Sequence, residues 1–299
     1  MSGAELSPLP FRGRDGGGGC PPRPTSRLGT GPTPTPPLKA RGFADDFPGL
    51  VNPDGSRWHY LDTAATAQKP QAVIDAVSRA MGTDYATVHR GVYARSAEMT
   101  LGYEAARRRV AGFIGGAEDE IVFTRGATEA INLVAYQCRE VVGSGRRVLL
   151  SQLEHHSNIV PWQLAGWQVD VCPLTTDGRI DLDAAEAMLT RDHAMVAFAH
   201  VSNVLGSRLD ARRAADLAHR VGAKLLLDGC QAVPRMSVDV AALDCDFYVF
   251  SAHKLYGPTG IGALWGRADL LAAMPANTVL LLNTPILRTV SRSDRQLSR

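Results

Sequence analysis

The chain has 299 residues, of which 45% are hydrophobic and 21% are charged, so it is long and apolar enough to bury a sizeable core. Its formal net charge of only +2 gives no electrostatic basis for binding nucleic acid or an anionic membrane. No apolar run approaches the roughly 20 residues that span a bilayer, so we expect no membrane partner.

The number and spacing of the cysteines indicate whether the protein resides in a reducing or an oxidising compartment. The chain has five cysteines, an odd number, at wide spacing and without a CxxC pair. This pattern is typical of a reduced cytoplasmic protein and argues against a disulfide scaffold or a zinc site. The five are Cys20, Cys138, Cys172, Cys230 and Cys245.

The first 42 residues differ in composition from the rest. Residues 1–40 hold nine of the 18 prolines and eight of the 29 glycines, and they contain no Ile or Val. Such a segment cannot bury enough apolar surface to offset its ordering entropy, so we predict that 1–42 is disordered. An organelle transit peptide and a misassigned start codon are alternative interpretations of the same stretch.

The region 43–275 is predicted to be one α/β domain. Short apolar strands alternate with helical patterns, which indicates a mostly parallel sheet with helices on both faces. We expect strands at 120–124, 146–151, 167–174, 194–202, 223–229 and 246–251. We expect helices at 128–137, 158–167, 181–190 and 210–222. Residues 276–299 continue neither pattern and are predicted to be an aberrant or disordered tail.

Ligands of open α/β sheets bind at the carboxyl ends of the strands, so the residues that follow each strand are the candidates for a site. After the first strand, Gly126, Ala127 and Thr128 open a helix, and a helix N-terminus with a hydroxyl is an anion site. Thr128 could equally be the N-cap of that helix.

The second strand is followed by adjacent histidines. His155 and His156 point in different directions on any regular element, which argues against both binding one metal ion. One imidazole could stack on an aromatic ligand, or both could be polar loop residues.

Two further strands end in Asn203 and Asp228. An aspartate that ends a buried strand is costly unless a cation or several donors meet it. It could instead cap a helix, with Gln231 as part of the cap or as a ligand contact. Asn203 could be a turn residue.

The last strand is followed by Ser251, His253 and Lys254. A lysine at a strand end, packed by Phe250 and Tyr256, would be partly desolvated and suited to Schiff-base chemistry. A surface lysine is the simpler interpretation of any single position. Together, however, an anion-binding helix start, a flat imidazole, a buried carboxylate and this amine match the needs of pyridoxal 5′-phosphate (PLP).

Seven ordered motifs then carry a resemblance to a known family. From about Phe43 to Met274 the chain resembles class V, fold-type I PLP-dependent enzymes and, more closely, cysteine desulfurases of the SUF type. The motifs are YLDTAATAQKP (60–70), ATVHRGVYARS (86–96), FTRGATEAINLVA (123–135), EHHSNIVPWQ (154–163), HVSNVLG (200–206), DGCQAVP (228–234) and DFYVFSAHKLYGPTGIGALWG (246–266). The resemblance implies the large domain of a fold-type I transferase.

The resemblance also implies roles for matching residues. Lys254 would join the cofactor aldehyde and move protons, and Asp228 would pair with the pyridinium nitrogen. Gln231 would hydrogen-bond the ring hydroxyl, and His155 would stack on the ring and shuttle a proton. Asn203 would contact the substrate or the cofactor.

The remaining implied residues fall into two groups. Thr128, Ser251 and His253 would hold the phosphate, with Ala127 in the same cofactor-binding turn. A second group, His89, Arg90 and Ala64, would lie at the substrate entrance or the dimer interface.

The implied reaction converts L-cysteine to L-alanine and leaves a persulfide that passes to a sulfur-acceptor protein for iron–sulfur cluster assembly. A homodimer is expected from the same resemblance, whereas the cysteine pattern indicates a cytoplasmic protein and the lack of a ligand cluster argues against a metal ion. The sequence departs from the family at its end, because the family continues beyond Met274 with a small domain that carries the catalytic cysteine loop and a substrate-binding arginine. We therefore expect the small C-terminal domain to be largely absent and turnover to be impaired. A selenocysteine lyase, an aminotransferase-like lyase or a non-catalytic fragment are the alternatives.

Overall fold

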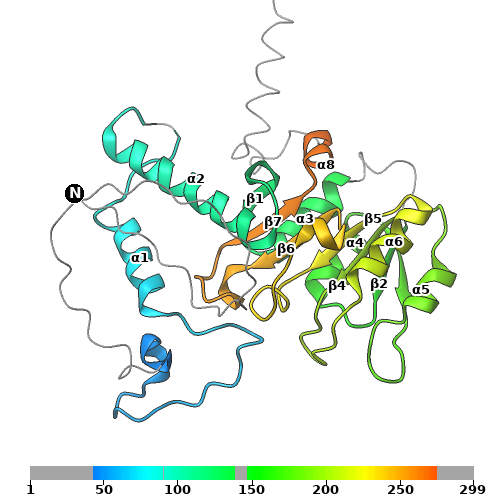
Figure 1. Ribbon diagram of the computed structural model, residues 1–299, viewed down its shortest axis with the longest axis horizontal. Helices are drawn as coiled ribbons and strands as arrows, with labels where there is room; N and C mark the ends of the chain where they lie inside the picture. Colours follow the sequence, from blue (N-terminus) through cyan, green and yellow to red (C-terminus); the bar gives the residue numbers. More distant parts are fainter. Residues whose placement is uncertain (1–42, 90, 139–146, 275–299) are drawn as a thin grey trace, which may run out of the picture. The chain divides into compact units, whose positions relative to one another are not determined.

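The computed structural model describes residues 43–89, 91–138 and 147–274, and its centre is a seven-stranded sheet (Figure 1). The strand order is β1-β7-β6-β5-β4-β2-β3. The strands are β1 (Ile121–Thr124), β2 (Arg147–Ser151), β3 (Gln168–Cys172), β4 (His193–Ala199), β5 (Lys224–Asp228), β6 (Phe247–Ser251) and β7 (Gly262–Gly266). The expected segments 1–42 and 276–299 lie outside the described residues.

The sheet is mixed but mostly parallel, as the sequence predicts. Neighbouring strands from β3 to β6 are all parallel, whereas β7 runs antiparallel to both β6 and β1. Gly262 therefore faces Ser251 on one side and Thr124 on the other. The carboxyl ends of β1, β2, β4, β5 and β6 consequently lie along one edge, where a ligand site is expected.

Helices cover both faces of the sheet, which confirms the predicted layering. The helices are α1 (Gln71–Met81), α2 (Ala94–Ile114), α3 (Ala127–Gln137), α4 (Val160–Leu164), α5 (Leu182–Met188), α6 (Ala211–Val221), α7 (Val240–Leu243) and α8 (Ala268–Ala273). One core lies under α3, α4 and α8, and the other lies under α5, α6, α7 and the end of α2. Strand residues alternate between them, since Leu149 enters one core and its neighbours Val148 and Leu150 enter the other.

Short-range signals explain the bounds of the helices that the sequence predicts well. Asp210 accepts a hydrogen bond from the backbone N–H of Arg213 at the start of α6, and Gly222 ends that helix with a φ of +86°. The alanines and the leucine between them are buried, so α6 packs closely on the sheet. The expected helix 210–222 is thus correct to within one residue at each end.

Two parts of the helical prediction are wrong or incomplete. The expected helix 158–167 is only a 3₁₀ turn, η5 (His156–Asn158), and the five-residue α4, because Gly166 takes a φ of +77° and reverses the chain. The expected helices also do not include α1, α2, α7 or α8. None of the residues of α1 is buried in the structure, so this helix does not pack an apolar face into the core.

The other described elements are short 3₁₀ turns: η1 (Phe43–Asp46), η2 (Pro48–Leu50), η3 (Glu118–Glu120) and η6 (Ala252–Lys254). Within the described part of the chain, no helix has the length and apolarity required to cross a membrane.

Candidate functional site

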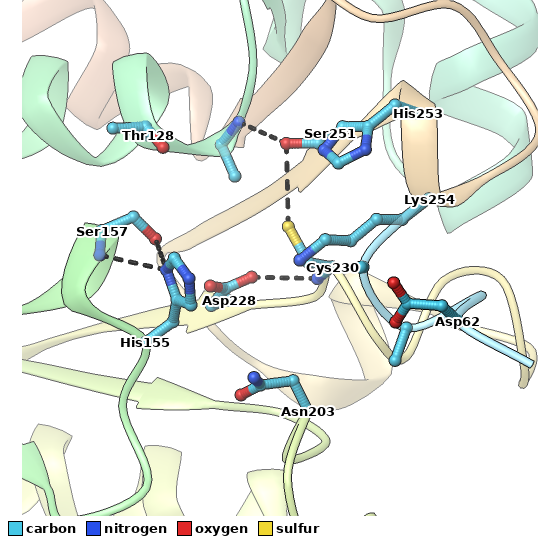
Figure 2. A pocket seen from close by; sticks show the side chains of 13 residues that line it. Asp62, Thr128, His155, Ser157, Asn203, Asp228, Cys230, Ser251, His253 and Lys254 are labelled. Carbon is cyan, nitrogen blue, oxygen red and sulfur yellow. Dashed lines mark hydrogen bonds between the residues drawn. The ribbon is translucent and has the colours of Figure 1, made fainter. Parts of the chain in front are cut away.

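A cavity of about 450 Å³ lies at the predicted edge of the sheet (Figure 2). Its walls come from the ends of β5 and β6, the start of α3, the turn after β2, the loop after β4 and a distant N-terminal segment. The lining residues are Asp62, Ala64, Ala65, Ala127, Thr128, His155, Ser157, Asn203, Asp228, Cys230, Ser251, His253 and Lys254. Residues that are up to 192 positions apart in the sequence therefore share one small space.

The start of α3 forms one end of this cavity. The N-cap of α3 is Gly126 and not Thr128, which corrects the capping alternative, and Thr128 is exposed in the first turn. The backbone N–H of Ala127 donates to Ser251 Oγ at 2.8 Å, which ties the helix start to the end of β6. A helix N-terminus beside a hydroxyl and an imidazole, that of His253, is suited to a phosphate group.

Glycine allows this close approach. A Cβ on Gly262 would lie 2.6 Å from both the Gly126 Cα and the Phe250 carbonyl oxygen. Because these are backbone atoms, neither can give way without moving α3 or β6. The antiparallel strand β7 therefore sets the distance between the helix start and the Ser251 hydroxyl.

Asp228 ends β5 and is only 8% exposed. Its Oδ1 accepts a hydrogen bond of 2.9 Å from the backbone N–H of Cys230, so the carboxylate does not cap a helix as one alternative had it. The other oxygen lies on the side that faces His155 (Figure 2). A buried carboxylate with one oxygen toward a cavity is suited to bind a cationic N–H group.

Lys254 is half-buried in η6, and its side chain points into the cavity toward the strand end that carries Asp228 (Figure 2). The turn below it is held by the His253 carbonyl oxygen. This oxygen accepts hydrogen bonds from the N–H of Ala67 at 2.8 Å, from Thr66 Oγ1 at 3.2 Å and from Lys69 Nζ at 3.2 Å. A segment almost 190 residues away in sequence thus fixes the base of the lysine.

His155 lines the cavity and His156 does not, as expected for adjacent histidines. The His155 Nδ1 accepts from the backbone N–H of Ser157 at 3.2 Å and lies 2.8 Å from Ser157 Oγ. Since the backbone N–H can only donate, the neutral ring carries its proton on Nε2.

Partial burial, and then the charge of Lys254, lower the pKa of His155. Partial burial also lowers the pKa of His253, and the charges of Lys254 and Lys69 lower it further. Both imidazoles are therefore neutral at pH 7.

Two other residues that were proposed from the sequence do not line the cavity. Gln231 does not line the cavity, because its side-chain amide donates to the carbonyl of Ala64 at 2.8 Å behind the wall. His89 is also outside the lining, and its Nε2 lies 3.0 Å from Glu104 Oε1. Ala64 and Asn203 do line the cavity, and Arg90 lies outside the described residues.

Several lining residues were not proposed from the sequence. Asp62, Ala65 and Ser157 line the cavity without having been proposed as site residues, and Cys230 was named only among the five cysteines. Ser157 had a local signal, since a serine two residues after a histidine can bond its ring. Asp62 and Ala65 lie in the motif 60–70, from which only Ala64 was assigned to the site, and a long-range fold brings this segment to the cavity.

The cysteines of the described residues are free and buried. Burial raises the thiol pKa of Cys138, Cys230 and Cys245 far above its ordinary value, and it raises that of Cys172 to about 11. Cys230 reaches the cavity wall, with its Sγ 3.9 Å from Ser251 Oγ. None of these four thiols is a nucleophilic thiolate at neutral pH.

Comparison with known proteins adds a family to this geometry. A sequence model described as aminotransferase class-V matches residues 59–291. The cysteine desulfurase of Klebsiella pneumoniae (strain 342) is 49% identical over 236 residues, which make up 77% of this chain and 58% of the relative. The cysteine desulfurase of Enterobacter sp. (strain 638) is 48% identical over 237 residues, with the same coverage. The chain thus spans 58% of the length of these curated relatives.

Solved structures of cysteine desulfurases have the same fold as this chain over the matched part. The cysteine desulfurase CsdA of Escherichia coli superposes with a TM-score of 0.69 at 40% identity, over 78% of this chain and 59% of that one. The apo cysteine desulfurase of Thermococcus onnurineus NA1 gives a TM-score of 0.71 at 33% identity, over 79% and 59%. The mixed sheet and its helices therefore match the cysteine desulfurase fold.

Proposed function

The chain belongs to the aminotransferase class-V family, and on this premise we propose that its cavity binds PLP and serves the chemistry of a cysteine desulfurase. The proposal rests on one observation above all: Lys254 and Asp228, from neighbouring strand ends, line the same small cavity. An amine and a buried carboxylate are the two groups that the aldehyde and the pyridine nitrogen of PLP require.

The residues of the cavity fit the cofactor. The start of α3, with Thr128, Ser251 and His253, is suited to the phosphate. Asp228 is suited to the protonated ring nitrogen, and the neutral His155 ring offers a flat surface for stacking. The cavity of about 450 Å³ falls in the range typical of small-molecule sites, about 300–1,000 Å³.

When bound, PLP supplies an electron sink for bonds broken next to the amino group of a substrate. The protein would then have three tasks. Lys254 would hold the aldehyde carbon and carry a proton at its Nζ. Asp228 would keep the ring nitrogen protonated, and His155, with its proton on Nε2, would serve as a proton donor in the cavity.

We extend the proposal to the substrate on the names of the relatives, and to the partners and location on the resemblance of the motifs. L-cysteine is the proposed substrate, and a sulfur-acceptor protein of iron–sulfur cluster assembly is the proposed recipient. A cytoplasmic homodimer is part of the same proposal, as are Ala64, His89 and Arg90 as entrance or interface residues. Gln231 is proposed to act on the site through the Ala64 carbonyl that it binds.

Sulfur removal needs a thiolate to attack the substrate sulfur. The four described cysteines are protonated and buried, so we propose that none of them is the attacking group. A class V enzyme that acts on selenocysteine, or a chain that binds PLP without turnover, is the second candidate, and the burial of the four described thiols favours it.

The test uses the full chain purified with added PLP. Borohydride reduction is expected to add a pyridoxyl group to the peptide that contains Lys254, and the visible absorbance of lysine-bound PLP is expected to vanish in Lys254→Ala. Lys224→Ala, at the opposite end of β5, is the control and should keep both signals. If wild type and Lys254→Ala give the same spectrum and the same labelled peptide, the proposal is wrong.

A further inference from the structure

A buried carboxylate lies directly beneath the turn that carries His155. Glu154 is only 9% exposed, and three donors meet it. Its Oε1 accepts from Ser151 Oγ at 2.5 Å and from the backbone N–H of Ala199 at 2.9 Å. Its Oε2 accepts from Asn158 Nδ2 at 2.7 Å. The carboxylate thus connects the end of β2, the end of β4 and η5.

The direction of these hydrogen bonds is fixed by a tryptophan. The indole N–H of Trp162 can only donate, and it donates to Asn158 Oδ1 at 3.1 Å. The amide nitrogen of Asn158 must therefore face Glu154, and it also donates to the Ala197 carbonyl at 3.3 Å. Position 154 consequently needs an acceptor at Oε2, which a carboxylate provides and the NH₂ group of a glutamine does not.

This network holds both sides of His155. The residue before it is Glu154 itself, and the His155 carbonyl accepts from the backbone N–H of Asn158 at 2.7 Å. Ala199, which donates to Glu154, stands opposite Asp228 in the register of β4 and β5. The carboxylate therefore links the His155 turn to the strand beside Asp228.

Placing a carboxylate here is costly. Burial raises the pKa of Glu154 to about 7, against the three hydrogen bonds that lower it, and the nearby charge of Asp228 raises it further, so the acceptor-only carboxylate is the main form above pH 7. An apolar side chain of the same size would avoid this cost but would leave three buried donors without an acceptor. The benefit of the carboxylate is thus the fixed geometry of the turn.

We propose that Glu154 is a positioning residue for His155, which it holds in one orientation over the cavity through Asn158 and Ala199. The use of that orientation in catalysis rests on the proposed function. The orientation itself is a property of the protein without any ligand.

The first readout is therefore made on the PLP-free full chain. In ¹⁵N NMR of the histidine rings, wild type is expected to show His155 as the Nε2–H tautomer with a lowered titration midpoint. Glu154→Gln places an NH₂ group against Asn158 Nδ2, so the turn should loosen. The His155 signals should then move to averaged tautomers, and the midpoint should rise toward the ordinary histidine value. A second readout is PLP dissociation, expected to be about tenfold faster, as loss of one charged hydrogen bond implies.

The control separates positioning from general destabilisation. Asp246→Asn removes another buried carboxylate, which accepts from His219 and from the N–H of Leu225 at the opposite end of the strands. It should lower stability yet leave the His155 tautomer unchanged. If Glu154→Gln does not fold, Ser151→Ala removes one neutral donor and should give the same change at smaller size.

Two results would overturn the proposal. One is a His155 tautomer and midpoint that stay at wild-type values in folded Glu154→Gln or, where that variant does not fold, in Ser151→Ala. The other is an equal change in Asp246→Asn. Failure of the proposed function looks different, because wild type would then bind no PLP while the effect of Glu154→Gln on the His155 signals would persist.

Discussion

The hydroxyl of Ser251, at the end of β6, accepts a 2.8 Å hydrogen bond from the backbone N–H of Ala127, the first residue of α3. The two residues are 124 positions apart, yet this contact is buried and lies at the end of the cavity that we propose for the phosphate. It leaves the hydroxyl proton of Ser251 free to turn toward a phosphate oxygen.

Ser251→Ala is expected to weaken PLP binding by about tenfold, because both the hydroxyl and the alignment of the helix start are lost. The unpaired N–H of Ala127 should also lower the free energy of unfolding by about 1–3 kcal/mol. Fluorescence titration with PLP and urea unfolding measure the two effects. Ser202→Ala is the matched control, since Ser202 is buried and accepts two backbone N–H groups outside the cavity. Equal PLP affinity in wild type and Ser251→Ala would contradict the assignment.

Gly262→Ala is expected to destabilise the protein by about 1–3 kcal/mol, because its methyl group would meet backbone atoms of Gly126 and Phe250 at 2.6 Å. The same displacement should weaken PLP binding, since α3 is pushed away from Ser251. Gly102→Ala in α2 is the control: a Cβ there meets nothing within 4 Å and should be neutral or stabilising by up to about 1 kcal/mol. Thermal unfolding without PLP measures the loss of stability, and its shift on addition of PLP measures the change in PLP binding. A Gly262→Ala variant as stable as Gly102→Ala would show that the close approach is unnecessary.

Lys69→Met tests the hydrogen bonds that hold the base of Lys254. Lys69 Nζ donates to the carbonyls of Ala67 and His253, and methionine keeps the length of the side chain without the donor. We expect lysine-bound PLP to form several-fold more slowly, while the change in unfolding free energy stays near 1 kcal/mol because the site is partly exposed. Stopped-flow absorbance after PLP addition measures the rate. A wild-type rate in Lys69→Met would mean that the N–H of Ala67 and the hydroxyl of Thr66 suffice to hold the turn.

His200 should make the fold sensitive to acid. Burial, followed by the charge of Arg208, lowers its pKa from 6.5 to about 4, and its Nδ1 is hydrogen-bonded to the Tyr248 hydroxyl at 2.9 Å. The unfolded chain binds this proton more readily than the folded one. Stability is therefore fully present above pH 6.5 and is lost as the pH falls toward 4, by an amount on the order of 3 kcal/mol.

The measurement is urea unfolding of wild type and His200→Asn between pH 4 and pH 7. The asparagine keeps a donor toward Tyr248 but cannot take up a proton in this range. Its unfolding free energy should fall less steeply below pH 6.5 than that of wild type. Parallel curves for the two proteins would show that His200 does not control the acid response.

Much of the site follows from the sequence because parallel strands share a carboxyl edge. Asp228 and Lys254 each follow a continuous apolar strand, and two neighbouring parallel strands must bring such residues together. His155, Asn203 and Ser251 follow from the same rule, and each lines the cavity. Six of the seven strands were predicted to within a few residues from their apolar runs, whereas β7 (Gly262–Gly266) was not among the expected strands.

The sequence determined which residues end the strands, because a local run of apolar residues predicts a buried strand and its end. Tertiary structure decided the rest through contacts between distant segments. Only the insertion of antiparallel β7 between β1 and β6 brings Gly126 against Gly262 and Ala127 against Ser251. Likewise, only the folded chain shows that Gln231 binds the Ala64 carbonyl behind the cavity wall. Such contacts depend on how helices and strands pack against one another, and no local pattern of residues encodes that packing.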